Sequence, residues 1–115
     1  MQPVTEQDLI NAGLTAPRVT PAAIEAAIDS EHYFTAEDGA TNSPPDIAWR
    51  GDFPPLALLT FCVLVLKNGF TVTGESACAS PENFDAEIGR RIARGNAIAK
   101  IWPLLGYELR TKLSA

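Results

Sequence analysis

Two helix starts stand out near the beginning of the chain. Thr5 and Asp8 form a Thr-x-x-Asp pattern that caps helix N-termini, and Thr20 followed by Pro21 is a second such start. Apolar residues follow each start at helical spacing. We therefore expect a short helix ending at Gly13 and a second helix over residues 21–32, which together make a helical part over residues 1–34.

Helix- and strand-breaking residues dominate the next stretch. Glycine, proline, asparagine and serine recur through residues 35–55, which predicts a long loop. Loops of this length are usually functional or disordered, and this one carries Trp49, Arg50 and Phe53. We expect these side chains to dock on the body of the protein or on a partner.

The strongest local signal is Asn68-Gly69 between two β-prone runs, residues 56–67 and 70–77. It is typical of a two-residue type I′ hairpin in which Lys67 pairs with Phe70. That pairing predicts a core face and a second, partly apolar face that needs a cover. The cover is either the N-terminal helices or another subunit. The expected core face carries Leu59, Phe61, Val63, Val65, Phe70 and Val72, and the second face carries Leu58, Cys62, Leu64 and Leu66.

The C-terminal part begins with a well-marked helix start at Ser80-Pro81-Glu82. Pro103 and Gly106 are expected to end this helix, and residues 107–110 alternate like a last strand. The sequence thus predicts an α+β fold: one domain over residues 1–115, with a ββαβ body and an antiparallel sheet over residues 56–115. The buried helix stripe is expected to be Phe84, Ile88, Ile92, Gly95, Ile98 and Trp102.

Charge is divided unevenly along the chain. Residues 1–53 hold nine acidic and two basic side chains, a net charge of −7. Residues 54–115 hold five acidic and seven basic side chains, a net charge of +2, so the whole chain carries −5. An acidic chain repels duplex nucleic acid, which binds through many phosphate contacts. The basic C-terminal half remains able to hold a small anion. The alternative is that the uneven charge distribution reflects only the solvated surface.

Location is indicated by three features. Cys62 and Cys78 give no disulfide framework and fit a reducing compartment. Glu6 and Asp8 stand where an export signal needs positive charge. The longest apolar run, residues 56–66, is shorter than the ~20 residues of a membrane helix, so we expect a cytoplasmic protein without a membrane partner.

Enzyme chemistry finds little support in the sequence. His32 is the only histidine, which leaves no histidine pair for zinc and no clear nucleophile–base set. Phosphate-loop and dinucleotide motifs are absent from the sequence. We expect a protein that is not an enzyme and carries neither a metal nor a cofactor.

Groups that suit a nucleotide gather in the C-terminal half. Guanidinium groups fork onto phosphates, aromatic rings stack on bases, and amides read base or ribose edges. The alternative is a solvated arginine face pairing with Glu87 and a phenylalanine that belongs to the core. The candidate ligand-binding residues are Asn83, Phe84, Arg90, Arg91, Arg94 and Arg110, with Asn96 nearby.

Three stretches carry a resemblance to a known family: LTFCVLVLKNGFTVTGESAC (59–78), ASPENFDAEIGRRIAR (79–94) and IWPLLGYELR (101–110). They resemble a small phage-protein family known as a podophage gene-product family, which includes the first type of Thoeris anti-defence proteins. The resemblance implies a phage sponge that sequesters, without cleaving, cyclic ADP-ribose isomers made by bacterial TIR enzymes. Some such sponges also take the cyclic oligonucleotides of CBASS, and they are homo-oligomers.

The resemblance also implies roles for individual residues. Phe84 matches the ring that stacks on adenine, Arg110 matches a phosphate contact, and Arg94 occupies a helix position expected to face the ligand. Arg50 is the one candidate for a further phosphate arginine upstream of the hairpin. The competing hypothesis is a phage accessory protein that binds a host protein through the apolar hairpin face and the loop around Trp49.

Overall fold

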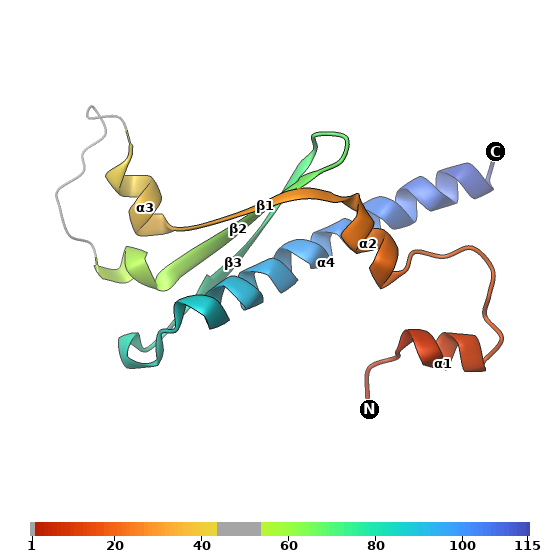
Figure 1. Ribbon diagram of the computed structural model, residues 1–115, viewed down its shortest axis with the longest axis horizontal. Coiled ribbons are helices and arrows are strands. Elements are labelled where there is room, and N and C mark those ends of the chain that lie inside the picture. The colour runs from red at the N-terminus through yellow and green to blue at the C-terminus, as the bar shows by residue number, and fades with distance from the viewer. Residues whose placement is uncertain (1, 44–53) are drawn as a thin grey trace.

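A three-stranded antiparallel sheet crossed by one long helix forms the centre of the molecule (Figure 1). The computed structural model describes residues 2–43 and 54–115. The strands lie in the order β1-β2-β3, and helix α4 packs against β2 and β3. The predicted α+β class is confirmed. The bounds are Ile28–Thr35 for β1, Leu59–Leu66 for β2, Thr71–Ala77 for β3 and Ala86–Leu113 for α4.

In the described residues, three short α-helices precede the hairpin. In α1, Glu6–Asn11, Asp8 N donates to Thr5 Oγ1 at 3.1 Å and Thr5 N donates to Asp8 Oδ2 at 2.9 Å, so the predicted capping box is confirmed. The second helix, α2, spans Pro21–Ala27 with Thr20 as its N-cap. Its predicted extension to residue 32 is wrong, because the chain turns at Ile28 into β1 and pairs with β2.

The predicted loop over residues 35–55 is wrong in its first part, because it begins with helix α3, Ala36–Thr41. Thr35 and Asp38 cap this helix through the same reciprocal bonds seen at Thr5, at 3.1 and 2.9 Å. A 3₁₀ turn over Pro54–Leu58 then leads into β2. The predictions for Trp49, Arg50 and Phe53 lie outside the described residues.

The hairpin is confirmed, but its predicted register is wrong by one residue. Leu66 N donates to Phe70 O, and Gly69 N donates to Leu66 O, both at 2.8 Å. The loop therefore has three residues, and Gly69 adopts a φ of 88° that suits glycine. This shift places Val72 and Gly74 on the face of Leu64, not of Val63.

The core lies between the sheet and the helices. The predicted core face is therefore wrong: Phe61, Val63 and Val65 are only half-buried, while the second face is closed off. Neither of the two covers considered is the main one: the C-terminal helix α4 lies over β2 and β3, and of the N-terminal helices α2 adds Ile24 to the core. The buried residues are Ile24 of α2, Cys62, Leu64, Leu66 and Val72 of the sheet, and Ala93, Ala97 and Ile101 of α4.

Helix α4 packs on the sheet through small residues. Its buried stripe is Gly89, Ala93, Ala97 and Ile101. A Cβ added to Gly74 of β3 would lie 2.2 Å from Ala93 O, so strand and helix are in direct backbone contact. The predicted stripe is wrong at Ile88, Ile92 and Trp102, which are exposed, whereas Ile98 is half-buried and packs against the core.

The predicted ends of this helix also differ from the structure. Residues Pro81–Asn83 form a 3₁₀ turn, and α4 begins after Asp85, whose carboxylate accepts from Ile88 N at 3.0 Å. The helix continues through Pro103 to Leu113, so the predicted last strand is wrong. Proline removes one backbone donor, and the good helix formers after it, with the Glu108–Lys112 pair, carry the helix on.

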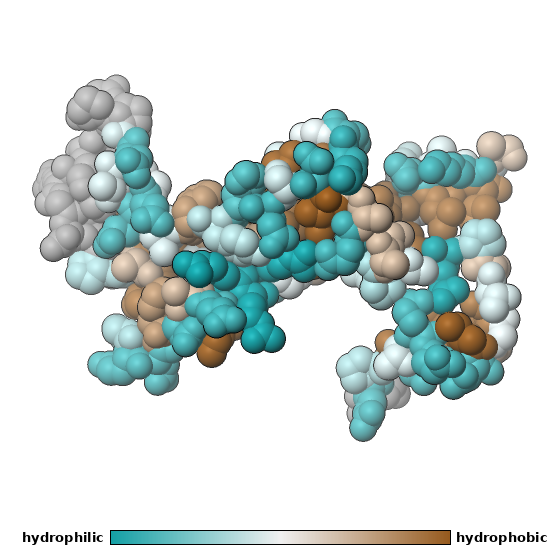
Figure 2. Space-filling view, viewed as in Figure 1, coloured by the Kyte–Doolittle hydropathy of each residue, from teal (hydrophilic) through white to brown (hydrophobic). Residues whose placement is uncertain are grey.

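The molecule is elongated, with extents of 57 × 34 × 18 Å. Its radius of gyration is 18.3 Å, against about 13 Å for a compact domain of this length. Helix α4 runs past the sheet toward the C-terminus, and Figure 2 shows hydrophobic side chains along that projecting end. In the two described ranges, no helix combines the length and apolar character needed to cross a membrane.

Candidate functional site

A pocket of about 290 Å³ lies where β2 begins, β3 ends and α4 starts. Its apolar wall includes Leu58, Phe84 and Ile88, and its polar groups include Asn83 and Ser76. The volume lies close to the lower end of the range for small-molecule pockets, which are mostly apolar with a few polar groups. The arrangement suits a flat ring with hydrogen-bonding edges.

Phe84 stands between this pocket and a smaller hollow of about 70 Å³. Tyr33 and Thr35 of β1, Asp38 of α3 and Arg90 of α4 line the hollow. Phe84 is half-buried and belongs to neither the buried core nor the residues packed against it. Its exposed part is therefore open to a ligand.

Arg90 and Arg91 flank the pocket on the first turns of α4. Arg90 lines the small hollow beside Phe84, and Arg91 lines a shallow surface depression with Ile88 and Ile92, which also border the pocket. Neither guanidinium makes an ion pair with any residue that the structure describes. The structure thus brings four of the six predicted site residues together: Asn83, Phe84, Arg90 and Arg91.

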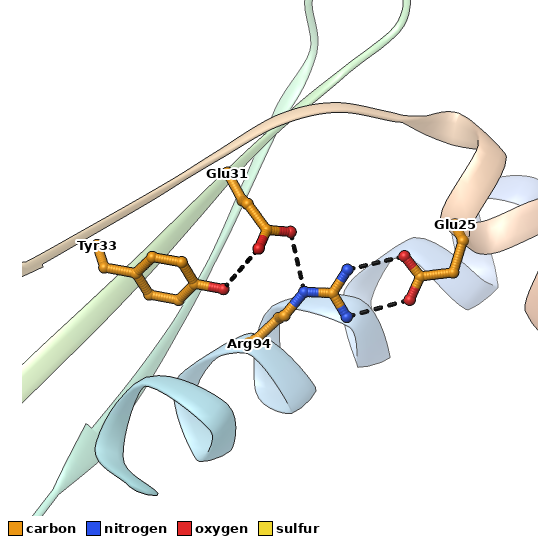
Figure 3. Close-up of polar contacts among 4 residues, drawn as sticks. All are labelled: Glu25, Glu31, Tyr33 and Arg94. Carbon is orange, nitrogen blue, oxygen red and sulfur yellow. Dashed lines mark hydrogen bonds and ion pairs between the residues drawn. The ribbon is translucent and has the colours of Figure 1, made fainter. Parts of the chain in front are cut away.

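Arg94 is held by acidic side chains of this same chain (Figure 3). Its Nη1 and Nη2 donate to Glu25 of α2 at 3.1 and 2.7 Å, and its Nε donates to Glu31 of β1 at 3.0 Å. Tyr33 Oη donates to the other Glu31 oxygen at 3.1 Å. Arg94 therefore ties α2 and β1 to α4, and a phosphate would compete with two carboxylates for it.

Proton affinities in this group follow from its contacts. The hydrogen bonds from Arg94 lower the pKa of Glu25, and the same bonds raise the pKa of Arg94. Burial, together with the bond to Glu31, raises the pKa of Tyr33 to about 12. Burial also raises the pKa of the Cys62 thiol, which keeps it protonated near neutral pH. The Arg94–Glu25 pair is therefore a charged structural link between α4 and α2.

Arg110 lies in the last turn of α4, far from Phe84. The helix has 28 residues and is about 42 Å long at ~1.5 Å per residue. Phe84 precedes its first turn. One chain therefore does not bring Arg110 and Phe84 to the same ligand.

Several neighbours of the site were missed by the sequence analysis. Thr60 and Ser76 come from strands, and Tyr33 and Asp38 come from segments predicted as helix and loop. Asn96 is not at the pocket, because its amide donates to Glu75 O at 2.8 Å and fastens β3 to α4. The repeated Thr-x-x-Asp pattern at Thr35 was a signal that could have placed α3 beside the site.

The cysteines and the histidine are not bonded to one another in the structure and make local polar contacts. Both cysteines are free; Cys62 is buried, and Cys78 Sγ donates to Ser80 O at 3.1 Å. Across residues 2–43 and 54–115, histidine, cysteine, aspartate and glutamate side chains form no group of three placed to hold a metal ion. His32 Nε2 lies 3.0 Å from Ser30 Oγ on β1.

Comparison with protein families places the chain in a phage protein family. The family model described as "Phage protein (N4 Gp49/phage Sf6 gene 66) family" matches residues 19–113, which is most of the chain. No curated protein and no solved structure matches.

Proposed function

Since the chain belongs to this phage protein family, we propose that it binds and sequesters a small cyclic nucleotide signal of host immunity without cleaving it. The ligand class is a cyclic ADP-ribose isomer made by TIR enzymes, with cyclic oligonucleotides as related ligands. The site of action would be the host cytoplasm. The resemblance of residues 59–94 and 101–110 to the family that includes the Thoeris anti-defence proteins supports this choice of ligand.

One structural observation carries the proposal: Phe84 and Asn83 border a pocket that Arg90 and Arg91 flank. A base stacked on Phe84 would present its edge to the Asn83 amide. The phosphates would then extend along the first turns of α4 to the two guanidinium groups. Arg94 contacts the ligand only if a phosphate displaces Glu25 or Glu31 from it. Arg110 contacts the ligand only if it comes from a second copy of the chain.

Binding without turnover is the second part of the proposal. Among the groups that the structure describes at the pocket, Ser76, Thr60 and Cys78 are the possible nucleophiles. No histidine accompanies them, and the carboxylate at the pocket, Asp85, is engaged as the N-cap of α4, where it accepts from Ile88 N at 3.0 Å. An activated nucleophile needs a base within hydrogen-bonding reach. The ligand should therefore be recovered intact when the protein is denatured after incubation.

The competing hypothesis of a host-protein binder loses one of its two surfaces, the apolar hairpin face; the loop around Trp49 lies outside the described residues. Cys62 and Leu64 of the expected hairpin face are fully buried under α4 and α2. That face is therefore not available to a partner. The same burial removes the original reason for expecting self-association through this face.

Calorimetric titration with cyclic ADP-ribose isomers tests the proposal. Phe84→Ala should weaken binding by about 5- to over 100-fold, because stacking on one base is worth ~1–3 kcal/mol. Phe84→Leu keeps an apolar side chain but has no ring to stack on the base, so it should lose most of the affinity that Phe84→Ala loses. Phe70→Ala, at an exposed aromatic on the hairpin loop, is the matched control and should bind normally.

Thermal melts of the same variants separate folding from binding. A Phe84→Leu variant that melts like the unaltered protein and binds equally well would contradict the stacking role. Binding unchanged in an Arg90→Gln, Arg91→Gln double variant would contradict the phosphate contacts. Release of a cleaved product would show that the protein is an enzyme.

A further inference from the structure

Thr60 is the only buried polar residue in the part of the chain that the structure describes, with 4% of its surface exposed. The Thr35 hydroxyl accepts from Asp38 N at 3.1 Å, whereas the Thr60 hydroxyl hydrogen-bonds to no residue in the ranges 2–43 and 54–115. A buried polar group without a partner lowers the stability of a fold. A ligand that bonded to this hydroxyl would supply the missing partner.

The Thr60 side chain lies beneath both cavities of the candidate site. It borders the pocket of about 290 Å³ and the small hollow of about 70 Å³ beside Phe84. In the sheet, Thr60 pairs with Thr35 of β1 and with Ser76 of β3. Thr35 lines the hollow and Ser76 lines the pocket, so a row of three hydroxyls crosses this end of the sheet.

Gly89 of α4 leaves the Thr60 hydroxyl uncovered. A Cβ added at Gly89 would lie 3.1 Å from Thr60 Oγ1, and Gly89 also lines the pocket. Alanine is more favourable than glycine inside a helix, so glycine at this position lowers the stability of the helix. The missing methyl group leaves room for a ligand atom beside the hydroxyl.

We propose that the small hollow holds a ribose of the ligand and that Thr60 hydrogen-bonds to one of the ribose hydroxyls. This inference rests on the proposed function and names the part of the nucleotide that determines specificity at the site. One water needs about 10–15 Å³, so a hollow of about 70 Å³ has room for a few groups of that size. That is enough for the hydroxyl edge of a sugar, whereas the base occupies the larger pocket.

The groups around the hollow suit a ribose that is joined to a phosphate. Asp38 lines the hollow, and its Oδ2 accepts from Thr35 N at 2.9 Å, which fixes the carboxylate there. A carboxylate accepts several hydrogen bonds but donates none, so its partner must be a donor. A sugar hydroxyl can donate to Asp38 while it accepts from Thr60. Arg90 lines the same hollow, which places a phosphate next to the sugar.

Calorimetric titration with adenosine monophosphate and its 2′,3′-dideoxy form tests this subsite, because the two probes differ only in the ribose hydroxyls. The unaltered protein should bind the ribose form about 10-fold more tightly or better, since a site built for a hydroxyl rejects an analogue without it. Thr60→Val keeps the shape but removes the hydroxyl, so it should weaken binding of the ribose form by about 2- to 10-fold. Binding of the dideoxy form should not change.

Two further variants and a thermal melt separate this role from a structural one. Thr60→Ser keeps the hydroxyl and should bind the ribose form normally, as should the matched control Thr71→Val, at an exposed position of β3. Thr60→Val should melt at the same temperature as the unaltered protein or higher, because it removes a buried hydroxyl without a partner. A lower melting temperature with unchanged affinity would show a structural hydroxyl and overturn the proposal.

The titrations also distinguish this subsite from the proposed function. Equal affinity for the two probes, unchanged affinity in Thr60→Val, or no binding of the ribose form would overturn the ribose subsite. If cyclic ADP-ribose isomers bind the unaltered protein and Thr60→Val equally well, the subsite fails and the proposed function stands. If the ribose probe binds as expected and no cyclic isomer binds, the proposed function fails and the subsite stands.

Discussion

Gly74 is the position where the structure makes its sharpest stability prediction. A Cβ at this residue would lie 2.2 Å from Ala93 O, 2.3 Å from Ala97 N and 2.9 Å from Ala97 Cα. All three atoms belong to the backbone of α4, so no side-chain rotation relieves the contact. The helix must move away from β3, which loosens its packing on Cys62 and Leu64.

The cost of Gly74→Ala follows from two opposing effects. Overpacking of a core costs ~1–3 kcal/mol, and backbone contacts place this substitution at the upper end. Replacing glycine in a strand stabilises the fold by ~0.5–1 kcal/mol, because the unfolded chain then loses less conformational entropy on folding. The free energy of unfolding should therefore fall by about 2 kcal/mol.

Urea denaturation followed by circular dichroism measures this change. The matched control is Gly39→Ala in α3, where an added Cβ meets nothing within 4 Å. It should keep or raise the stability, by up to ~1 kcal/mol. Equal stability of Gly74→Ala and the unaltered protein would refute the close packing of β3 on α4.

Three further predictions concern the group around Arg94. Arg94→Ala should lower the free energy of unfolding by about 1–2 kcal/mol, because both carboxylates are partly exposed and each ion pair is worth at most ~1 kcal/mol. Arg94→Lys lacks the planar, forked guanidinium group, so it should recover only part of this stability in the same urea titration. The pKa of Glu25 is lowered from 4.5, so its ion pair with Arg94 stabilises the fold above that pH and this stabilisation is lost as the pH falls. The difference in the free energy of unfolding between the unaltered protein and Arg94→Ala should therefore shrink as the solution is acidified. The pKa of Tyr33 is raised from 10.0 to about 12, so stability should decline as pH rises between these values. In a Tyr107→Phe background, tyrosinate absorbance should report that titration, and a midpoint near 10 in the folded protein would contradict the burial of Tyr33.

Local signals in the sequence predicted much of the fold, and contacts between distant residues decided the rest. The capping pattern at Thr5 and the Asn68-Gly69 turn were sufficient to predict a helix and a hairpin. Two- and three-residue loops both use glycine here, so the turn did not determine the register. That single-residue difference decided which face of β3 is buried.

The orientation of α4 was mispredicted because the helix is apolar on two sides. Large residues such as Ile88 and Ile92 are a stronger burial signal than Ala93 and Ala97. The close approach allowed by Gly74 decided in favour of the small side. Such a choice depends on the facing strand, which the helix sequence does not contain.

The candidate site was predicted where its residues are neighbours along the chain. Asn83, Phe84, Arg90 and Arg91 lie within a few turns, and the structure keeps them together around the pocket. The partners of Arg94 lie 63 and 69 residues away, and no local pattern points to them. The strand groups Thr60 and Ser76 were missed for the same reason.

Native mass spectrometry with cyclic ADP-ribose isomers tests the central claim most directly. The protein should gain the full mass of the ligand at micromolar concentration, and denaturation should release the ligand unchanged. The Phe84→Leu variant should show this adduct much more weakly than the Phe70→Ala control. The claim would be contradicted if no isomer gave an adduct, if Phe84→Leu bound as well as the control, or if the ligand were released as cleavage products.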